Sequence, residues 1–504
     1  MTAHFVILPV ILPAVMAGLM VLFARSPAFA RLGSGLALAG LIALAAYNLA
    51  QASLGPSPYF LGNWPAPFGI VLVLDRLSAL MLALVAGLAG VVMAYVLATG
   101  WDRRGQYFHP LFMFQLMGLN GAFLTADAFN LFVFFEVLLI ASYGLLVHSG
   151  GAERMRAGLQ YVAFNLLGST VFLFALAMIY AISGTLNMAD LAQKLPLMPP
   201  EDAALMRLSA VLLLVVFAIK GALVPLQFWL PRSYAAAPAP VAALFAVMTK
   251  VGVYAMIRFG TLVFAPTLVA TGTLWGNILW ATGLMGIAVG ALGVLAAARL
   301  APLIGFAIIG SMGVVVLTLS QFTAPALAAA LYYAVHSALA AATLFLLLDM
   351  INARRGGDDL AQAGPKMAQE GLIAGLFMAA AVAMVGLPPL SGFVGKVQVL
   401  QALSAHAPVD APVAWSVILL GTLVTMIGFA RAGSALFWRV DTAQASAKHP
   451  AQPIALAAIF ALIAAMVALS LFAAPVAEWL AITADNLIAP QAYIDVQSLP
   501  AVAP

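Results

Sequence analysis

Long apolar segments follow one another along almost the whole sequence, separated only by short polar connectors. A helix of about 20 apolar residues is needed to cross the ~30 Å hydrocarbon core of a bilayer, and most of these segments reach that length. Hydrophobic residues make up 65% of the 504 residues and charged residues only 8%. No soluble domain of this size could cover so much apolar surface. The sequence therefore predicts an all-α, polytopic membrane protein.

We expect about fourteen transmembrane helices, of which the seventh and twelfth are interrupted. Their predicted ranges are 4–24, 32–54, 77–99, 108–125, 128–148, 157–183, 204–230 (interrupted), 237–258, 273–297, 301–320, 324–350, 371–405 (interrupted), 412–437 and 452–480. The longest polar connectors, 184–203 and 351–370, are too short for a separate soluble domain. The segment after Asp485 is rich in Ala and Pro, and we expect it to be poorly ordered.

The basic residues of the connectors divide unequally between the two sides of the predicted membrane. One side collects 14 of them: Arg25, Arg31, Arg103, Arg104, Arg154, Arg156, Arg232, Arg299, Arg354, Arg355, Lys366, Arg431, Arg439 and Lys448. The other side collects 4: Arg76, Lys194, Arg207 and Arg258. Cytoplasmic loops carry the excess of Lys and Arg, so we expect both termini outside the cytoplasm. No basic residue precedes the first apolar run, which favours an uncleaved first helix over a signal peptide.

Several classes of function are disfavoured by what the sequence lacks. It contains no cysteine, which rules out disulfides, thiol chemistry and iron–sulfur ligation by this chain. We find no metal-ligand cluster, nucleotide-binding loop or nucleophile triad, and the net charge of +4 gives no indication of nucleic-acid binding. We therefore expect neither covalent chemistry nor a cofactor or metal, and we do not expect an enzyme.

Two lysines stand deep in the apolar stretch 213–258. Lys220 and Lys250 are surrounded by Val, Leu, Phe and Ala, and Pro225 follows Lys220 where it should break the helix. A charge at bilayer depth costs at least ~2.5–3.5 kcal/mol, so it is retained with a partner, a watery cavity or a function. A lysine removed from water also gives up its proton more readily near neutral pH. The alternative is that each lysine has only a packing role, with its ammonium group extended toward the membrane surface.

A third lysine lies beside a second predicted break. Pro388 and Pro389, with Gly386 and Gly392 close by, should interrupt the twelfth span just before Lys396. Freed backbone groups are tolerated at membrane depth only beside protein or water. The order of lysine and proline is reversed relative to the seventh span, yet two lysines near breaks indicate a duplicated unit.

Glu136 and His336 complete the set of ionisable residues inside apolar spans. Glu136 lies near the middle of the fifth span, where a carboxylate is usually functional, although a neutral or hydrogen-bonded packing role is the alternative. His336, in the eleventh span, is equally compatible with a satisfied core histidine. We predict that these two and the three lysines form a proton relay, with a carboxylate facing Lys220 to hold it charged.

Four further ionisable residues lie at the ends of spans. His109 and His148 are expected to anchor at the membrane interface. Asp75 and Asp127 could funnel cations or simply be solvated.

Four segments resemble a known family. They read FNLFVFFEVLLIASYGLL, GTLNMADLA, FWLPRSYAAAPAPVAALFAVMTKVGVYA and GLPPLSGFVGK. Together, over about residues 75–440, they are similar to the proton-translocating antiporter-like subunits shared by Mrp-type multisubunit cation/proton antiporters and respiratory complex I. The fifth, eighth and twelfth spans are most similar to the D subunit of the Mrp-type (Pha-type) antiporter.

The resemblance implies fourteen helices containing two inverted five-helix repeats. The expected units are 1–107, the first three helices; 108–258, the first repeat; 259–440, the second repeat; and 441–504, the last helix with a short tail. It also implies that Glu136, Lys220, Lys250 and Lys396 match the family's glutamate and lysines. One complex I subunit of the family has a glutamate in the twelfth helix, so Lys396 argues against that subunit.

Three functions remain open at this point. The first is a subunit of a secondary antiporter in a bacterial inner membrane, exchanging protons inward for Na⁺ or K⁺ outward with a larger antiporter-like subunit and several small ones. The second is a proton-pumping subunit of a redox complex, either complex I or a membrane-bound hydrogenase. The third is a membrane scaffold whose buried charges only fix helix packing.

Overall fold

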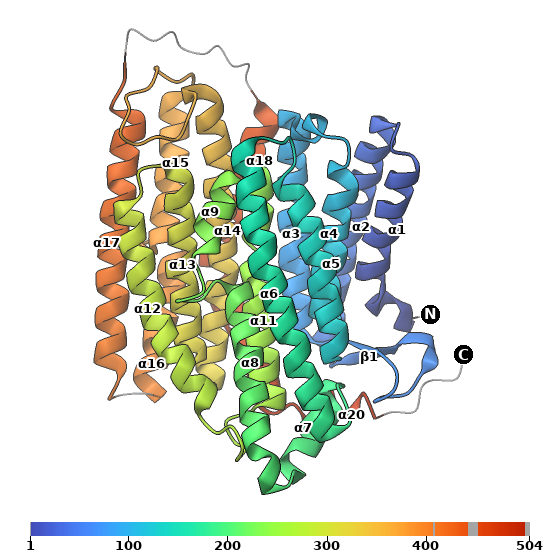
Figure 1. Cartoon of the computed structure of the whole chain (residues 1–504). Coiled ribbons are helices and arrows are strands. Elements are labelled where there is room, and N and C mark those ends of the chain that lie inside the picture. The colour runs from blue at the N-terminus through green and yellow to red at the C-terminus, as the bar shows by residue number, and fades with distance from the viewer. Residues whose placement is uncertain (1, 407–408, 442–451, 499–504) are drawn as a thin grey trace.

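The structure of the chain is a computed structural model that describes residues 2–406, 409–441 and 452–498. Long helices run side by side through the molecule, and both ends of the chain lie on the same side of it (Figure 1). Eleven helices of the described residues are long and apolar enough to cross a membrane, and shorter apolar helices accompany them. The predicted helical, multi-pass fold is confirmed.

Every predicted span is occupied by a helix or by a pair of shorter helices. The N-terminal half contains α1 (Leu8–Leu22), α2 (Pro27–Ala52), α3 (Arg76–Thr99), α4 (Phe108–Leu124), α5 (Ala128–Leu146), α6 (Ala152–Ser183), the short α7 (Met188–Lys194), α8 (Ala203–Gly221), α9 (Trp229–Ala236), α10 (Ala239–Phe245) and α11 (Met248–Arg258). The C-terminal half contains α12 (Leu274–Ala296), α13 (Leu300–Leu319), α14 (Ala324–Arg355), α15 (Glu370–Val385), α16 (Ser391–His406), α17 (Ala411–Phe437), α18 (Pro453–Leu471), α19 (Ala473–Ile488) and α20 (Gln491–Asp495).

The seventh and twelfth spans are interrupted, as predicted. In the seventh, α8 ends at Gly221 because Ala222 takes a left-handed conformation, with φ 53° and ψ 47°, and α9 begins only at Trp229. Pro225 lies between them and offers no backbone N–H to continue a helix. In the twelfth, α15 ends at Val385, before a left-handed Gly386, and α16 begins beyond the two prolines.

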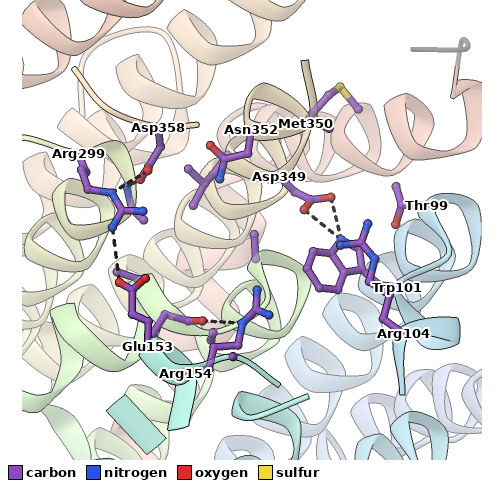
Figure 2. A pocket seen from close by; sticks show the side chains of 18 of the residues that line it. Thr99, Trp101, Arg104, Glu153, Arg154, Arg299, Asp349, Met350, Asn352 and Asp358 are labelled. Atoms are coloured by element: carbon purple, nitrogen blue, oxygen red, sulfur yellow. Dashed lines mark hydrogen bonds and ion pairs between the residues drawn. The ribbon is translucent and has the colours of Figure 1, made fainter. Parts of the chain in front are cut away.

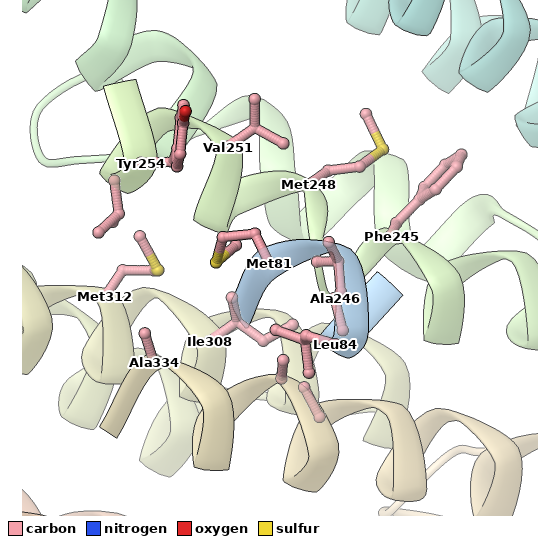
Figure 3. Packing of buried hydrophobic residues seen from close by; sticks show 14 of the residues in the cluster. Met81, Leu84, Phe245, Ala246, Met248, Val251, Tyr254, Ile308, Met312 and Ala334 are labelled. Carbon is pink, nitrogen blue, oxygen red and sulfur yellow. The ribbon is translucent and has the colours of Figure 1, made fainter. Parts of the chain in front are cut away.

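The eighth span lies at the centre of the molecule and is itself divided. A two-residue turn at Ala246–Val247, where each backbone N–H bonds the carbonyl three residues earlier, separates α10 from α11, which the sequence did not predict. The segment Ala239–Val263 is the most deeply enclosed of the long spans. Figure 3 shows Met81 of α3 and Ile308 and Met312 of α13 on one side of this span, whereas Met248 and Val251 point to its other side, where they line the small cavity that Lys220 also touches. The side chain of Lys250, on α11, is accordingly buried.

Two local features differ from the sequence-based expectations. The chain is not entirely helical, because β1 (Ser57–Phe60) and β2 (Val71–Leu74) form a small antiparallel hairpin with Ser57 opposite Leu74. The expectation of a poorly ordered tail after Asp485 is wrong for residues 486–498, where α19 continues and α20 follows. Residues 499–504 of that tail lie outside the described residues.

Candidate functional site

Lys220 lies in the last turn of α8, directly before the break. Its Nζ donates a hydrogen bond of 3.1 Å to Oδ1 of Asn165 on α6 and lies 5.5 Å from the ring centre of Phe135 on α5. A cavity of about 10 Å³ touches Lys220, Asn165, Tyr161 and other side chains around them. That is close to the space that one water molecule requires, roughly 10–15 Å³.

Glu136 faces the same group of residues from α5. Its carboxylate accepts a hydrogen bond from the hydroxyl of Ser169 on α6 and lies within electrostatic range of Lys220. Lys220 and Glu136 therefore lie close together, and α6 contacts both of them, Lys220 through Asn165 and Glu136 through Ser169.

Lys250 lies on α11 with 1% of its surface exposed. Its Nζ is 3.4 Å from the hydroxyl of Thr249, a long contact for a buried ammonium. Gly252 brings α11 against α8, since an added Cβ would fall 2.6 Å from the backbone nitrogen of Gly221. The helices that carry Lys220 and Lys250 are thus in backbone contact.

His336, on α14, bridges the break in the twelfth span. Its Nε2 lies 3.0 Å from the carbonyl oxygen of Ala383 in α15, and its Nδ1 lies 2.8 Å from the hydroxyl of Ser391 in α16. A carbonyl can only accept, so Nε2 carries a proton and Nδ1 pairs with the hydroxyl. Gly392 is required there, because an added Cβ would lie 2.7 Å from Nε2.

Lys396 belongs to α16, but its ammonium group contacts the end of α15. Nζ donates a hydrogen bond of 2.8 Å to the carbonyl of Val385 and a second to the hydroxyl of Thr422 on α17. A cavity of about 30 Å³ beside it is also touched by the hydroxyl-bearing side chains of Ser311, Tyr333 and Thr425. This volume can hold a water molecule, with polar partners available.

The five predicted residues thus fall into two groups. The first group is Glu136 and Lys220. The second is Lys250, His336 and Lys396, in which the histidine lies within electrostatic range of both lysines. The small cavity at Lys220 also touches Val251, the residue after Lys250. The two groups are carried by neighbouring helices, since α8 and α11 are in backbone contact at Gly252.

The residues at span ends are structural in this fold. Asp75 caps α3 through Ser78 and forms a two-contact ion pair with Arg258, at 2.8 and 2.9 Å. Asp127 caps α5 by accepting from the backbone N–H of Asn130. Neither carboxylate is freely solvated, since both are largely enclosed.

The two histidines at span ends are also buried in polar contacts. Nε2 of His109 lies 3.3 Å from Asp102, which also binds Arg31 at 2.6 Å. Burial alone would raise the pKa of Asp102, but hydrogen bonds from Arg31 and His109 hold it below its usual range. Nε2 of His148 lies 3.0 Å from the carbonyl of Trp101, and burial lowers the pKa of that imidazole. Neither histidine anchors at an exposed interface.

A larger polar cavity of about 630 Å³ opens on the face opposite the chain termini, between the starts of α6 and α13 and the end of α14. Figure 2 shows Asp349 in its wall, bound at 3.0 Å by the indole N–H of Trp101. Arg104 stacks on that indole at 3.7 Å, and Arg299 bridges Asp358 and Glu153 across the cavity. Asp349 was not predicted from the sequence because it lies near the polar end of its span.

Other residues that were not predicted are uncharged: Asn165, Ser169, Ser391 and Thr422 hold the predicted groups in place. Such residues are common in membrane helices, so composition gave no signal for them. Within the described ranges no cluster of three or more His, Asp or Glu side chains has a metal-binding arrangement.

Two interrupted helices beside buried lysines, in a multi-pass helical fold, define a membrane protein of the transporter type. The family described as "NADH:quinone oxidoreductase/Mrp antiporter, TM" matches residues 125–409. The chain belongs to this family.

Individual relatives match the chain over almost its full length. It is 39% identical to the probable K⁺/H⁺ antiporter D subunit of Rhizobium meliloti, covering 97% of this chain and 96% of that one. It is 38% identical to the Na⁺/H⁺ antiporter D subunit of Alkalihalophilus pseudofirmus, covering 98% and 99%. A chain in the structure of the Mrp complex from Dietzia sp. DQ12-45-1b superposes with a TM-score of 0.88 at 26% identity, covering 99% of both.

Proposed function

We propose that this chain is the proton-translocating subunit of a multisubunit antiporter that exchanges protons for Na⁺ or K⁺ across a bacterial inner membrane. The observation that carries the proposal is the pairing of each interrupted span with a lysine at membrane depth, Lys220 beside one break and Lys396 beside the other. Secondary transporters build their ion sites from such broken helices. The names of the two curated relatives, matched over nearly their whole length, support the same function.

Protons move between the two groups of buried residues described above. Glu136 stabilises the charged form of Lys220, and weakening of that contact lets desolvation expel the proton. Water in the cavity beside Lys220 passes it toward Lys250, and His336 connects Lys250 with Lys396. The lysines and the histidine each hold and release a proton at a nitrogen atom, and no covalent bond is formed.

Partner subunits complete the antiporter. The described part of the chain offers no converging set of carboxylates for an alkali cation. In this proposal the cation is coupled through a larger antiporter-like subunit and several small membrane subunits. The similarity to a chain of the Mrp complex, which is itself an assembly, supports this arrangement.

Orientation follows from the basic residues. Both termini lie on one side of the molecule (Figure 1), and the connector before α4, with Arg103 and Arg104, and the start of α6, with Arg154 and Arg156, lie at the other. The positive-inside rule then puts the termini outside the cytoplasm; Lys448, counted with the basic side, lies outside the described residues. Because the chain has no cysteine, a membrane-impermeant maleimide should label Leu197→Cys in spheroplasts, and Tyr107→Cys only after permeabilisation. The reverse pattern would invert the assignment.

The same proton path also suits a pumping subunit of a redox complex. Gene neighbours separate the two: small companion membrane subunits indicate the antiporter, whereas quinone- and NADH-enzyme subunits indicate the pump. A scaffold without transport is the third candidate, and it predicts that neutral substitution of all three lysines leaves transport intact.

The decisive experiment measures cation-dependent proton flux in inverted vesicles that carry the complete complex. A proton gradient is established, then Na⁺ or K⁺ is added and the collapse of the gradient is followed by a fluorescent probe. We expect collapse with one or both cations and none in vesicles that lack this chain. Cation-independent pumping driven by an electron donor would replace the antiporter with the redox-complex function.

A further inference from the structure

A second cavity, of about 290 Å³, lies at the face that carries both termini. Its walls come from the end of α2, the start of α3, the end of α11 and the pair α19–α20. None of the five residues of the proton path lines it. The cavity is therefore a separate feature of the molecule, and its chemistry can be considered independently of transport.

The inner wall of this cavity contains Arg258, with 3% of its surface exposed. Its two terminal nitrogens are occupied by Asp75, at 2.8 and 2.9 Å, and the ring of Tyr493 covers the guanidinium at 4.5 Å. Its Nε is buried and has no hydrogen-bond partner among the described residues. A buried donor of this kind is rarely left unpaired, and water or a bound ligand is the usual partner of such a group.

Arg76 lines the same cavity and also has a buried nitrogen without a hydrogen-bond partner in the part of the chain that the structure describes. Nη2 donates to the carbonyl of Ser53 at 3.3 Å, and the guanidinium stacks on Trp479 at 5.2 Å. Nη1 is buried without a partner among the described residues. The cavity thus contains two guanidinium groups and one carboxylate, Asp75, and so carries one uncompensated positive charge.

The rim of the cavity, unlike its inner wall, contains exposed apolar side chains. Leu54 and Ile482, which both line it, expose 83% and 42% of their surfaces. Large apolar side chains exposed at the edge of a membrane protein face lipid. A soluble anion would gain nothing from this rim, whereas a molecule with a charged head and apolar chains would match both parts of the site.

We propose that this cavity binds the headgroup phosphate of an anionic phospholipid, with its acyl chains over Leu54 and Ile482. The phosphate lies against the wall that Arg76 and Arg258 form, and guanidinium groups are well suited to phosphate. The net charge of the site favours a lipid with a net negative headgroup over a zwitterionic one. The bound lipid joins α3, α11 and α19 at this face.

The test uses the complete complex, purified and delipidated in detergent, with the melting temperature as the readout. Phosphatidylglycerol, phosphatidylcholine and inorganic phosphate are titrated separately against the parent, Arg76→Gln and Arg207→Gln. Arg207 is the matched control, since it lies at the same face, is exposed, and donates to one backbone carbonyl, that of Ala270 at 2.6 Å. Native mass spectrometry counts the retained phosphatidylglycerol in each sample.

We expect phosphatidylglycerol to raise the melting temperature of the parent and of Arg207→Gln, because a ligand that binds only the folded state stabilises it. Arg76→Gln should need about tenfold more lipid for the same shift, as expected for one lost charge-assisted hydrogen bond, and should retain one lipid fewer. An unchanged titration in Arg76→Gln overturns the site. Equal protection by inorganic phosphate or by phosphatidylcholine overturns the assignment to an anionic lipid.

Discussion

The ammonium of Lys396 donates a 2.8 Å hydrogen bond to the carbonyl of Val385, the last residue of α15, although Lys396 belongs to the other half of the interrupted span. Lys220 is the penultimate residue of α8, the first half of the other interrupted span. Both lysines therefore sit where a first half-helix ends, and a helix C-terminus carries the negative end of its dipole. The reversed order of lysine and proline along the chain conceals this shared position.

The first prediction follows from that position. Lys396→Ala should abolish cation-dependent proton flux in inverted vesicles, because it removes a protonatable group and its contacts with Val385 and Thr422. Thr422→Val removes one acceptor only, and should lower the flux by about tenfold, the usual effect of one hydrogen bond to a charged group. Lys366→Ala, at an exposed site, is the control and should leave flux unchanged.

Pro389 tests whether the break itself matters. Pro389→Ala restores a backbone N–H, which should partly extend a half-helix, shift Lys396 and reduce flux. If both Pro389→Ala and Lys396→Ala transport normally, the twelfth span has only a structural role and the duplicated-unit hypothesis is wrong.

A second prediction concerns titration of Lys220. Lys220→Ala should abolish transport while the complex still assembles. Lys220→Arg should fail as well, since a guanidinium does not release its proton at physiological pH. Lys194→Ala, where the lysine pairs with Asp190 at the surface, is the matched control. Normal flux in Lys220→Arg would leave Lys220 with a fixed-charge role only.

A third prediction separates charge from packing at Glu136. Glu136→Gln keeps the shape of the side chain and can still accept from Ser169, but it removes the negative charge near Lys220. We expect severe loss of flux with normal protein level, whereas Ser169→Ala should have the smaller effect. Wild-type flux of Glu136→Gln across the whole pH range would mean that this carboxylate is there for packing.

The extent to which the sequence predicted these features depends on what makes a residue conspicuous. Charges in apolar spans are costly, so Glu136, Lys220, Lys250, His336 and Lys396 could be found one by one. Prolines revealed the breaks because they remove backbone donors. Hydropathy was enough for the spans, since the bilayer sets their length.

What remained hidden was the arrangement of those residues in space. Asn165 could not be recognised as the partner of Lys220, since an uncharged polar residue costs little in a membrane helix. Asp75 and Arg258 lie 183 positions apart, each at the end of a span, where a charge needs no partner to be tolerated. The ordered tail was missed because Tyr493 is held by its contact with Arg258, not by local sequence.

The Asp75–Arg258 pair gives a fourth prediction, on stability and its pH dependence. Asp75→Asn leaves the buried guanidinium without its counter-charge, and loss of one member of a buried pair costs about 3–5 kcal/mol. Burial alone would raise the pKa of Asp75, but Arg258 and Ser78 hold it below its usual range. Because the pKa of Asp75 is lower in the folded than in the unfolded protein, its ionised carboxylate stabilises the folded state. This stabilisation is fully present above the pKa of the unfolded state, near 3.9, and is lost as the pH falls through the pKa of the folded state.

The melting temperatures of parent and Asp75→Asn in detergent should therefore differ most at neutral pH and converge below about pH 4. Asp495→Asn, whose carboxylate is exposed and bonds only Gln491 among the described contacts, serves as the control and should melt like the parent. A difference that stays constant down to pH 3 would show that the pair contributes shape and not charge.

The fifth prediction concerns the chain on its own, which should not catalyse cation/proton exchange. The buried groups of the proposed proton path are suited to protons. Hard cations require several converging oxygen ligands, and the described residues contain no group of three or more Asp, Glu or His side chains placed to hold a metal ion. An antiporter couples two ions through one change of state, so the second ion must be handled by partner subunits. The purified chain, folded and monodisperse, is reconstituted in proteoliposomes with a pH gradient, and Na⁺ or K⁺ is added. The complete complex under the same conditions is the positive control. Robust cation-dependent collapse of the gradient by the isolated chain would contradict the prediction and assign the cation path to this subunit.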